Sequence, residues 1–424
     1  MKPAGQALTE WKDGWPLPIV AAIGIATFNM PIQSLGVFFE PLEEALGWSR
    51  ATSASGLFAL SAVAVFTIPL AGRLLDQMGA RRVALPGIIV FCLAFAGLGL
   101  AQSSVWTWWA LWVLLGIAAA LVSPVVWTGA VASRFDQGRG LALALSLSGA
   151  GLATIIGPML SNWLIADYGW RGAYAGLAAL CCIILLPLVV FFFFGAREKA
   201  ERDEPLRVQS AQPSAPEAVP LREAIRDTRF LRLALTTFMV AVSLLALVVH
   251  FVPILTAAGI DRTRAAEAAA VIGIGSISGR LVTGLLLDRI HGRLVGCGIF
   301  TIPVVVALAL LTLDENSATI LIIAFFLGFS LGGEIDIIAY LTSRYFGVKR
   351  FGAYFGLIMS SLTLATGVGP LIAGWAYDVV GSYDALIMGA IFPFLMASGL
   401  ILSLGPYPEA EDDAAEPELA DAQA

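Results

Sequence analysis

Charged residues are scarce in this sequence. Asp, Glu, Lys and Arg make up 13% of its 424 residues, about half of the roughly 25% typical of soluble domains. Apolar residues make up 58%, more than a soluble chain can bury, and the composition therefore predicts a membrane protein. The net charge is −6, and no basic stretch suggests binding to nucleic acid.

Histidine and cysteine are also rare. The two histidines, His250 and His291, fall near opposite faces of the predicted membrane region, and the four cysteines all lie within apolar runs. Their spacing fits neither a metal site nor a disulfide in a loop. The sequence contains no nucleotide-binding loop and no Ser/His/Asp set. We therefore expect no catalytic residue, no metal and no cofactor, and a chain that is not an enzyme.

Long apolar runs, in contrast, are abundant. A run of about 20 apolar residues is enough to cross a bilayer as a helix. We predict an all-α membrane protein with twelve transmembrane helices, over residues 16–39, 52–75, 83–101, 106–132, 140–165, 170–195, 230–257, 266–287, 294–313, 318–343, 352–376 and 385–405. The polar stretch 196–229 is typical of a cytoplasmic linker, and the acidic residues 409–424 are typical of a disordered tail.

The distribution of basic residues predicts the orientation. Cytoplasmic loops carry an excess of Lys and Arg. With the N-terminus inside, most of the 25 Lys and Arg fall in cytoplasmic segments. The outside loops then hold only Arg50, Arg171, Arg262 and Arg264, and one base, Arg280, falls deep in the membrane. We expect both termini to be cytoplasmic and no cleavable signal at the start.

The chain is internally duplicated. Gly72-Arg-Leu-Leu-Asp76 recurs 212 residues later as Gly284-Leu-Leu-Leu-Asp288, and Gly157-Pro158 recurs at the same offset as Gly369-Pro370. The duplication predicts two six-helix halves, residues 1–195 and 230–408. Transporters built from such repeats place the substrate near the bilayer midplane, between the repeats.

The repeated segment resembles a known signature. Gly72 to Arg82 is similar to the loop between the second and third spans of major facilitator transporters, and Gly284 to Arg293 is similar to its second copy. The resemblance implies the major facilitator fold. It also implies a latch on the cytoplasmic side, formed by Gly72, Asp76, Arg81, Asp288 and Arg289.

A narrower resemblance covers most of the chain. Asp13-Gly14-Trp15, Ser34 to Phe39, and Arg134-Phe135 followed by Arg139 to Gly151 resemble motifs of the monocarboxylate transporter family, which includes bacterial oxalate/formate exchangers. The resemblance implies that Arg280, followed by Gly284, binds a substrate carboxylate. Two positions depart from the family. Ser276 stands where the proton-coupling aspartate is expected, and Gln33 stands where animal members have a lysine.

Arg280 also stands out on physical grounds. A guanidinium within the membrane is costly unless it is paired or faces water, and its planar fork suits a carboxylate. Its repeat counterpart is Ile68, so the duplicated scaffold does not require a base here. Substrate binding is one interpretation, and an internal ion pair with an acid of the tenth span is the other. Since 352–376 contains no second base, a monoanion fits better than a dianion.

Other polar residues within the predicted spans are further candidates. Asp336 and Glu334 are candidates for proton coupling or for a structural pair, and their separation of two residues places them on different helix faces. Tyr340 shares a face with Asp336. His250 is a third candidate for coupling or a packing residue. Trp127, together with Gln33, Ser276 and Tyr340, is a candidate for contact with the substrate, although Trp127 also suits packing.

We predict a secondary active transporter that moves a small organic monocarboxylate across the cytoplasmic (inner) membrane by alternating access, with proton symport. The expected partners are the carboxylate, protons and the lipid bilayer, without nucleic acid or an obligate protein partner. Three alternatives remain at this point: an anion exchanger, an exporter of amphipathic compounds, and a membrane sensor.

Overall fold

The protein is described by a computed structural model that covers residues 10–12, 14–135, 139–194, 224, 226–287, 289–312 and 317–407. Within these ranges the chain forms helices and no strand, as predicted. The principal helices are α2 (Pro16–Leu46), α3 (Arg50–Met78), α4 (Ala80–Gly97), α5 (Val105–Ala120), α6 (Pro124–Arg134), α7 (Arg139–Leu147), α8 (Gly149–Phe192), α11 (Thr228–Val249), α12 (Phe251–Ala257), α13 (Arg262–Leu287), α14 (Gly292–Leu311), α15 (Ser317–Val380) and α16 (Asp384–Leu402). The predicted acidic tail, most of the predicted linker, Asp13 and Asp288 lie outside the described residues.

The sequence at the first helix–helix connection explains its geometry. Helix α2 begins at Pro16, whose missing N–H would have no partner in the first turn. It ends at Leu46 and is capped by Gly47, whose φ of 67° is left-handed and whose N–H donates to the Glu43 carbonyl. Two residues later, the Ser49 side chain accepts from the Thr52 N–H and caps α3. Helix α2 is thus longer than the predicted span 16–39.

Within the part of the chain that the structure describes, eleven helical segments are long and apolar enough to cross a membrane. One of them, Leu141–Phe192, has 52 residues, which at about 1.5 Å per residue is more than twice the roughly 30 Å of a bilayer core. Gly169, with φ 67° and ψ 170°, divides it into two legs. Helix α15 likewise holds two candidate spans, Ala318–Phe346 and Tyr354–Val380. The rings of Phe346 and Tyr354 stack 4.0 Å apart across the connection between them.

Three predicted spans contain a break. The span 140–165 is interrupted at Ser148, between α7 and α8. The span 106–132 is interrupted between Ala120 and Pro124, and the span 230–257 is interrupted at His250, between α11 and α12. The last two breaks each lie near a proline, Pro124 and Pro253, which removes a helical N–H and crowds the preceding turn. These spans were predicted to be continuous helices, and that prediction is wrong at the breaks.

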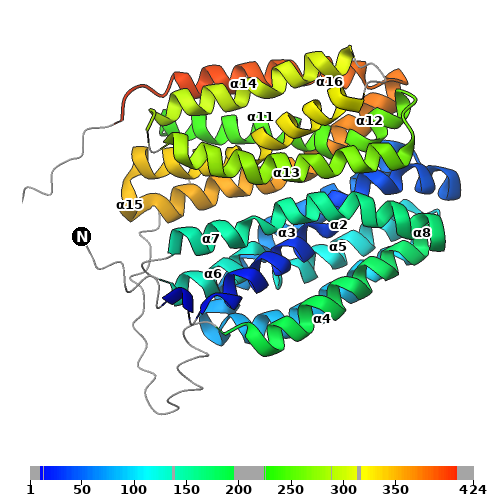
Figure 1. The fold of residues 1–424 in the computed structure, drawn as a ribbon, viewed down its shortest axis with the longest axis horizontal. Coiled ribbons are helices and arrows are strands. Elements are labelled where there is room, and N and C mark those ends of the chain that lie inside the picture. The colour runs from blue at the N-terminus through cyan, green and yellow to red at the C-terminus, as the bar shows by residue number, and fades with distance from the viewer. Residues whose placement is uncertain are drawn as a thin grey trace, which may run out of the picture.

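The buried side chains form two hydrophobic clusters. One extends from Leu17 to Phe193, and the other extends from Ala224 to Leu404. Figure 1 shows the corresponding arrangement, with α2 to α8 in one group and α11 to α16 in the other. We call these groups the N-half and the C-half. Val37 of α2 belongs to the second cluster and Val249 of α11 to the first, so each half contributes a valine to the core of the other.

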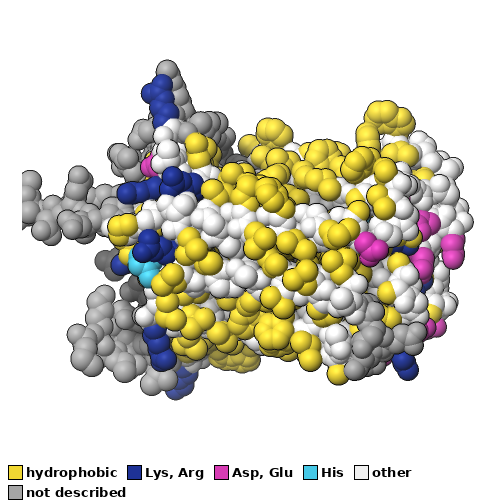
Figure 2. All heavy atoms as spheres, turned by 90° about the horizontal axis from the view of Figure 1, so that it is seen from above, with side chains coloured by type: hydrophobic (Ala, Val, Ile, Leu, Met, Phe, Trp, Pro, Cys, Tyr) yellow, Lys and Arg dark blue, Asp and Glu magenta, His cyan; other side chains and the backbone are white. Residues whose placement is uncertain are grey.

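The two ends of the molecule differ in charge. We call the end where α2 begins and α16 ends the terminal end, and the end that holds the turn at Gly47 the distal end. Figure 2 shows Lys and Arg concentrated at the terminal end, Asp and Glu at the distal end, and hydrophobic side chains over the surface between them.

Candidate functional site

Arg280 of α13 and Asp336 of α15 form an ion pair. Arg280 Nη1 donates to Asp336 Oδ1 at 3.0 Å. The side chains remain 12% and 26% exposed, so neither group is sealed within the protein. The structure thus brings together the base and one of the acids that the sequence singled out.

Glycines place the two helices close enough for this pair. A Cβ on Gly279 would lie 2.0 Å from the Phe329 carbonyl oxygen, and one on Gly332 would lie 1.9 Å from the Ser276 carbonyl oxygen. Both distances are far below a van der Waals contact, so only glycine permits this approach of α13 to α15. Ser276 is buried at this contact, one turn before Arg280.

The position of Arg280 on α13 faces the junction of the halves. Gly273 and Ile277 lie on the α13 surface that packs against Gly151 and Ile155 of α8 in the N-half. Arg280 follows at positions i+7 and i+3, so it continues this surface toward the terminal end. The guanidinium is therefore held within the C-half at the edge of the interface between the halves.

Glu334 lies apart from the ion pair. It is 2% exposed, and its Oε1 atom has no hydrogen-bond partner. Ser330, one turn earlier on the same face of α15, donates to the Ile299 carbonyl of α14. Because Asp336 is about 200° further around the helix, the two acids point in different directions, as expected from their spacing.

His250 is fully buried and fully hydrogen-bonded. Nδ1 lies 2.9 Å from the Tyr383 hydroxyl, and Nε2 lies 2.9 Å from the Pro370 carbonyl oxygen. Arg50 Nη1 donates to the same hydroxyl at 2.6 Å. A carbonyl only accepts and a guanidinium only donates, so the neutral imidazole donates through Nε2 and accepts from Tyr383 through Nδ1. Through these hydrogen bonds, His250 links α11 to the distal end of the C-half.

The remaining candidates for substrate contact are dispersed. Trp127 is fully buried, its indole N–H donates to the Val122 carbonyl at 2.7 Å, and its ring packs against Phe193. The indole thus occupies the break before α6. Gln33 lies beside Gly157 of α8, and Tyr340 lies beside Gly292 at the start of α14. Among the described contacts, none joins these three residues to Arg280.

The predicted cytoplasmic latch is described in part. Gly72 lies on α3. Arg81, at the start of α4, donates to the Val190 carbonyl at 2.5 Å and lies 4.1 Å from the Phe194 ring centroid, both within the N-half. Arg289 lies in the turn before α14. The side chain of Asp76 and all of Asp288 lie outside the described residues, so the latch remains a prediction.

A polar cluster at the distal end was not predicted from the sequence. It is formed by Glu43 and Arg50 of the N-half with Tyr383 and Asp378 of the C-half. One signal could have revealed it. Gly374-Trp-Ala-Tyr-Asp378 repeats the G-x-x-x-D spacing of Gly72–Asp76 and Gly284–Asp288.

Comparisons with known proteins agree with this architecture. A family profile described as "Major Facilitator Superfamily" matches residues 20–370. The chain is similar to "Monocarboxylate transporter 13" of Rattus norvegicus, with 26% identity over 92% of this chain and 89% of the relative. It is similar to "Monocarboxylate transporter 11" of Homo sapiens, with 28% identity over 95% and 83% of the respective chains. It is also similar to "Gallate transporter" of Pseudomonas putida, with 23% identity over 86% and 90%. The match to the family profile covers most of the chain, which therefore belongs to the Major Facilitator Superfamily.

Proposed function

We propose that the protein is a secondary active transporter of a small organic monocarboxylate, and that Arg280 binds the carboxylate. The observation that carries the proposal is the Arg280–Asp336 pair at the junction of the halves. The Asp336 carboxylate occupies the position that a substrate carboxylate would take on the same guanidinium. Relatives named as monocarboxylate and gallate transporters support this substrate class.

The pair also suggests how a proton enters the cycle. While Asp336 is ionised, it neutralises Arg280 and competes with the substrate. Protonation of Asp336 releases the guanidinium, so the proton and the anion bind together. Linkage requires that each tighten the binding of the other by the same factor. Asp336 therefore takes the role left open by Ser276, and Glu334 is the second candidate.

We further propose twelve spans with both termini in the cytoplasm. The kink at Gly169 divides Leu141–Phe192 into two spans of ordinary length. The concentration of Lys and Arg at the terminal end supports placing that end on the cytoplasmic side of the cytoplasmic (inner) membrane. The distal end then faces the opposite side, and the two halves open alternately to the two sides.

The test is uptake of a panel of labelled monocarboxylates into proteoliposomes, with and without an inward proton gradient. Arg280→Lys should lower the initial rate by roughly tenfold or more, because an ammonium cannot replace a charge-assisted fork worth about 1.5–3 kcal/mol. Arg264→Lys is the matched control, since Arg264 lies exposed on the same helix. Full transport by Arg280→Gln at normal expression would remove Arg280 from the site. Accumulation that does not depend on the proton gradient but requires a carboxylate on the opposite side of the membrane would indicate exchange in place of symport.

A further inference from the structure

Two backbone N–H groups at the start of α3 find their acceptor in the other half. Asp378, near the end of α15, accepts from the Arg50 N–H through Oδ1 at 3.1 Å and from the Ala51 N–H through Oδ2 at 3.0 Å. The first N–H groups of a helix have no partner within the helix. Ser49 satisfies the Thr52 N–H, so a residue of the C-half completes the cap of an N-half helix.

A glycine one turn before Asp378 makes this cap possible. A Cβ on Gly374 would lie 2.6 Å from the Ala51 nitrogen and 2.8 Å from the Ala51 Cα. Gly367, two turns earlier, approaches Phe58 of α3 in the same way, since its Cβ would lie 2.6 Å from the Phe58 Cα. These glycines keep the two helices in close contact across the interface at the distal end.

The Arg50 side chain forms a second connection at the same place. Its Nε donates to Glu43 at 3.0 Å within the N-half. Its Nη1 donates to the Tyr383 hydroxyl at 2.6 Å, and its guanidinium lies 3.8 Å from the Tyr377 ring centroid in the C-half. The side chain is only 9% exposed. A buried guanidinium is thus satisfied by acceptors and a ring face from both halves.

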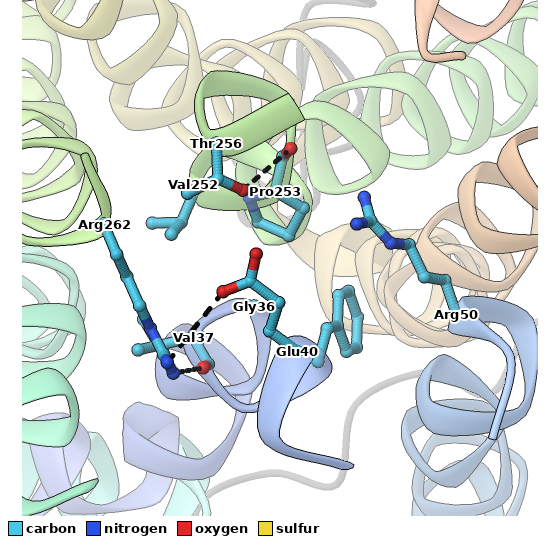
Figure 3. A pocket seen from close by; sticks show the side chains of 9 residues that line it. Gly36, Val37, Glu40, Arg50, Val252, Pro253, Thr256 and Arg262 are labelled. Atoms are coloured by element: carbon cyan, nitrogen blue, oxygen red, sulfur yellow. Dashed lines mark hydrogen bonds and ion pairs between the residues drawn. The ribbon is translucent and has the colours of Figure 1, made fainter. Parts of the chain in front are cut away.

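A third set of contacts borders a crevice between α2, α3, α12 and α13 at the distal end. Figure 3 shows Glu40 lying between Arg262 and Arg50, with Arg262 joined to Glu40 and to the Val37 carbonyl. The Arg262–Glu40 distance is 3.9 Å. Gly36 also lines the crevice, and its Cβ would lie 2.1 Å from the Val249 carbonyl oxygen.

We propose that these contacts form a distal gate, and that Asp378 is the positioning residue that holds it closed. Separation of the halves at this end removes Asp378 from α3 and leaves two helix N–H groups to water. It also breaks the contacts of Arg50 with Tyr383 and Tyr377, and it breaks the contacts of Arg262 with Glu40 and with the Val37 carbonyl. Asp378 touches no group assigned to the substrate, so it acts on the balance between distal-closed and distal-open forms. The inference holds whatever the substrate is.

The test measures that balance directly. Spin labels at Gln102 of the N-half and Arg264 of the C-half, in a transport-competent background whose native cysteines have been replaced, report the distance across the distal end without substrate. Asp378→Ala should raise the ratio of distal-open to distal-closed molecules by roughly fivefold, as expected for loss of a helix cap. Asp378→Asn, which keeps the size but loses the charge, should raise it by less.

Asp384→Ala is the matched control, because Asp384 is exposed nearby at the start of α16 and has no described contact with α3. It should leave the ratio unchanged. An unchanged ratio of distal-open to distal-closed molecules in Asp378→Ala, or an equal rise in Asp384→Ala, would overturn the proposal that Asp378 holds the distal gate closed. If Asp378→Ala does not fold, Asp378→Asn gives the same decision. Since no substrate is present, the result is independent of whether Arg280 binds a carboxylate.

Discussion

Arg280 and Asp336 belong to two helices of the same half and meet at 3.0 Å, on the edge where that half faces the other. A pair of this kind is costly to break from one side only, because the remaining charge loses its counterion in a poorly solvated place. Under the proposed function, a substrate anion would provide a new counterion for Arg280, and a proton would remove the charge of Asp336. The anion and the proton together would then separate the pair at a lower free-energy cost than either one alone.

Asp336→Asn mimics the protonated acid. We expect it to bind substrate tightly and with no dependence on pH between about pH 5 and about pH 8, whereas the affinity of the wild type falls as pH rises and Asp336 ionises. Proton-driven accumulation should be lost while exchange survives. Substrate affinity at each pH, followed by uptake and exchange in proteoliposomes, checks this. An unaltered pH profile in the variant would rule out Asp336.

Glu334→Gln separates the two acids. Glu334 is buried, and its Oε1 atom has no partner, so a neutral side chain of the same shape should be tolerated. We expect Glu334→Gln to fold normally and to retain proton-driven accumulation in the same assay. The opposite result, loss of accumulation with retained exchange, would move the coupling role from Asp336 to Glu334.

Gly36→Ala introduces a methyl group into the distal interface. Its Cβ would lie 2.1 Å from the Val249 carbonyl oxygen, which belongs to backbone and cannot rotate away. Overpacking of about 1.4 kcal/mol corresponds to a roughly tenfold shift toward the distal-open form. The spin-label distance across the distal end measures this shift. Gly298→Ala is the control, since a Cβ there meets no atom within 4 Å, and an equal response to both variants would contradict the prediction.

Tyr383→Phe removes the hydroxyl that joins Arg50 to His250. Both partners are buried, so we expect a loss of about 1–3 kcal/mol in stability, measured by thermal unfolding in detergent. Tyr377→Phe is the matched control, because the described contact of Tyr377 with Arg50 uses the ring, and it should be near neutral.

The titration of Tyr383 makes the stability difference between wild type and Tyr383→Phe depend on pH. Burial raises the pKa of the Tyr383 phenol, so folding favours its neutral form. The stability difference between wild type and Tyr383→Phe should be constant below about pH 10, the ordinary pKa of tyrosine, and should shrink above it as the unfolded chain ionises. A difference that grows with rising pH would contradict this assignment.

The helices and the family could be predicted from the sequence, because long apolar runs and repeated motifs carry strong signals. The pairing of Arg280 with an acid of the tenth span was one of two interpretations of this lone base, beside binding of a substrate. The interruptions at Ser123 and His250 were not predicted, since prolines are also tolerated within membrane helices. The distal gate was missed for a different reason. Arg50 and Asp378 are 328 residues apart, and a charge at the end of an apolar run is indistinguishable from one that faces water.

The two valines that pack in the core of the opposite half make opening of the distal end depend on temperature. Val37 and Val249 are 2% and 4% exposed, each within the hydrophobic cluster of the opposite half, and opening of the distal end transfers both to water. Hydration of apolar surface raises the heat capacity, and the free-energy cost of exposing that surface to water becomes smaller on cooling. Opening should therefore become easier at low temperature, and the Arrhenius plot of turnover should curve where movement of this end limits the rate.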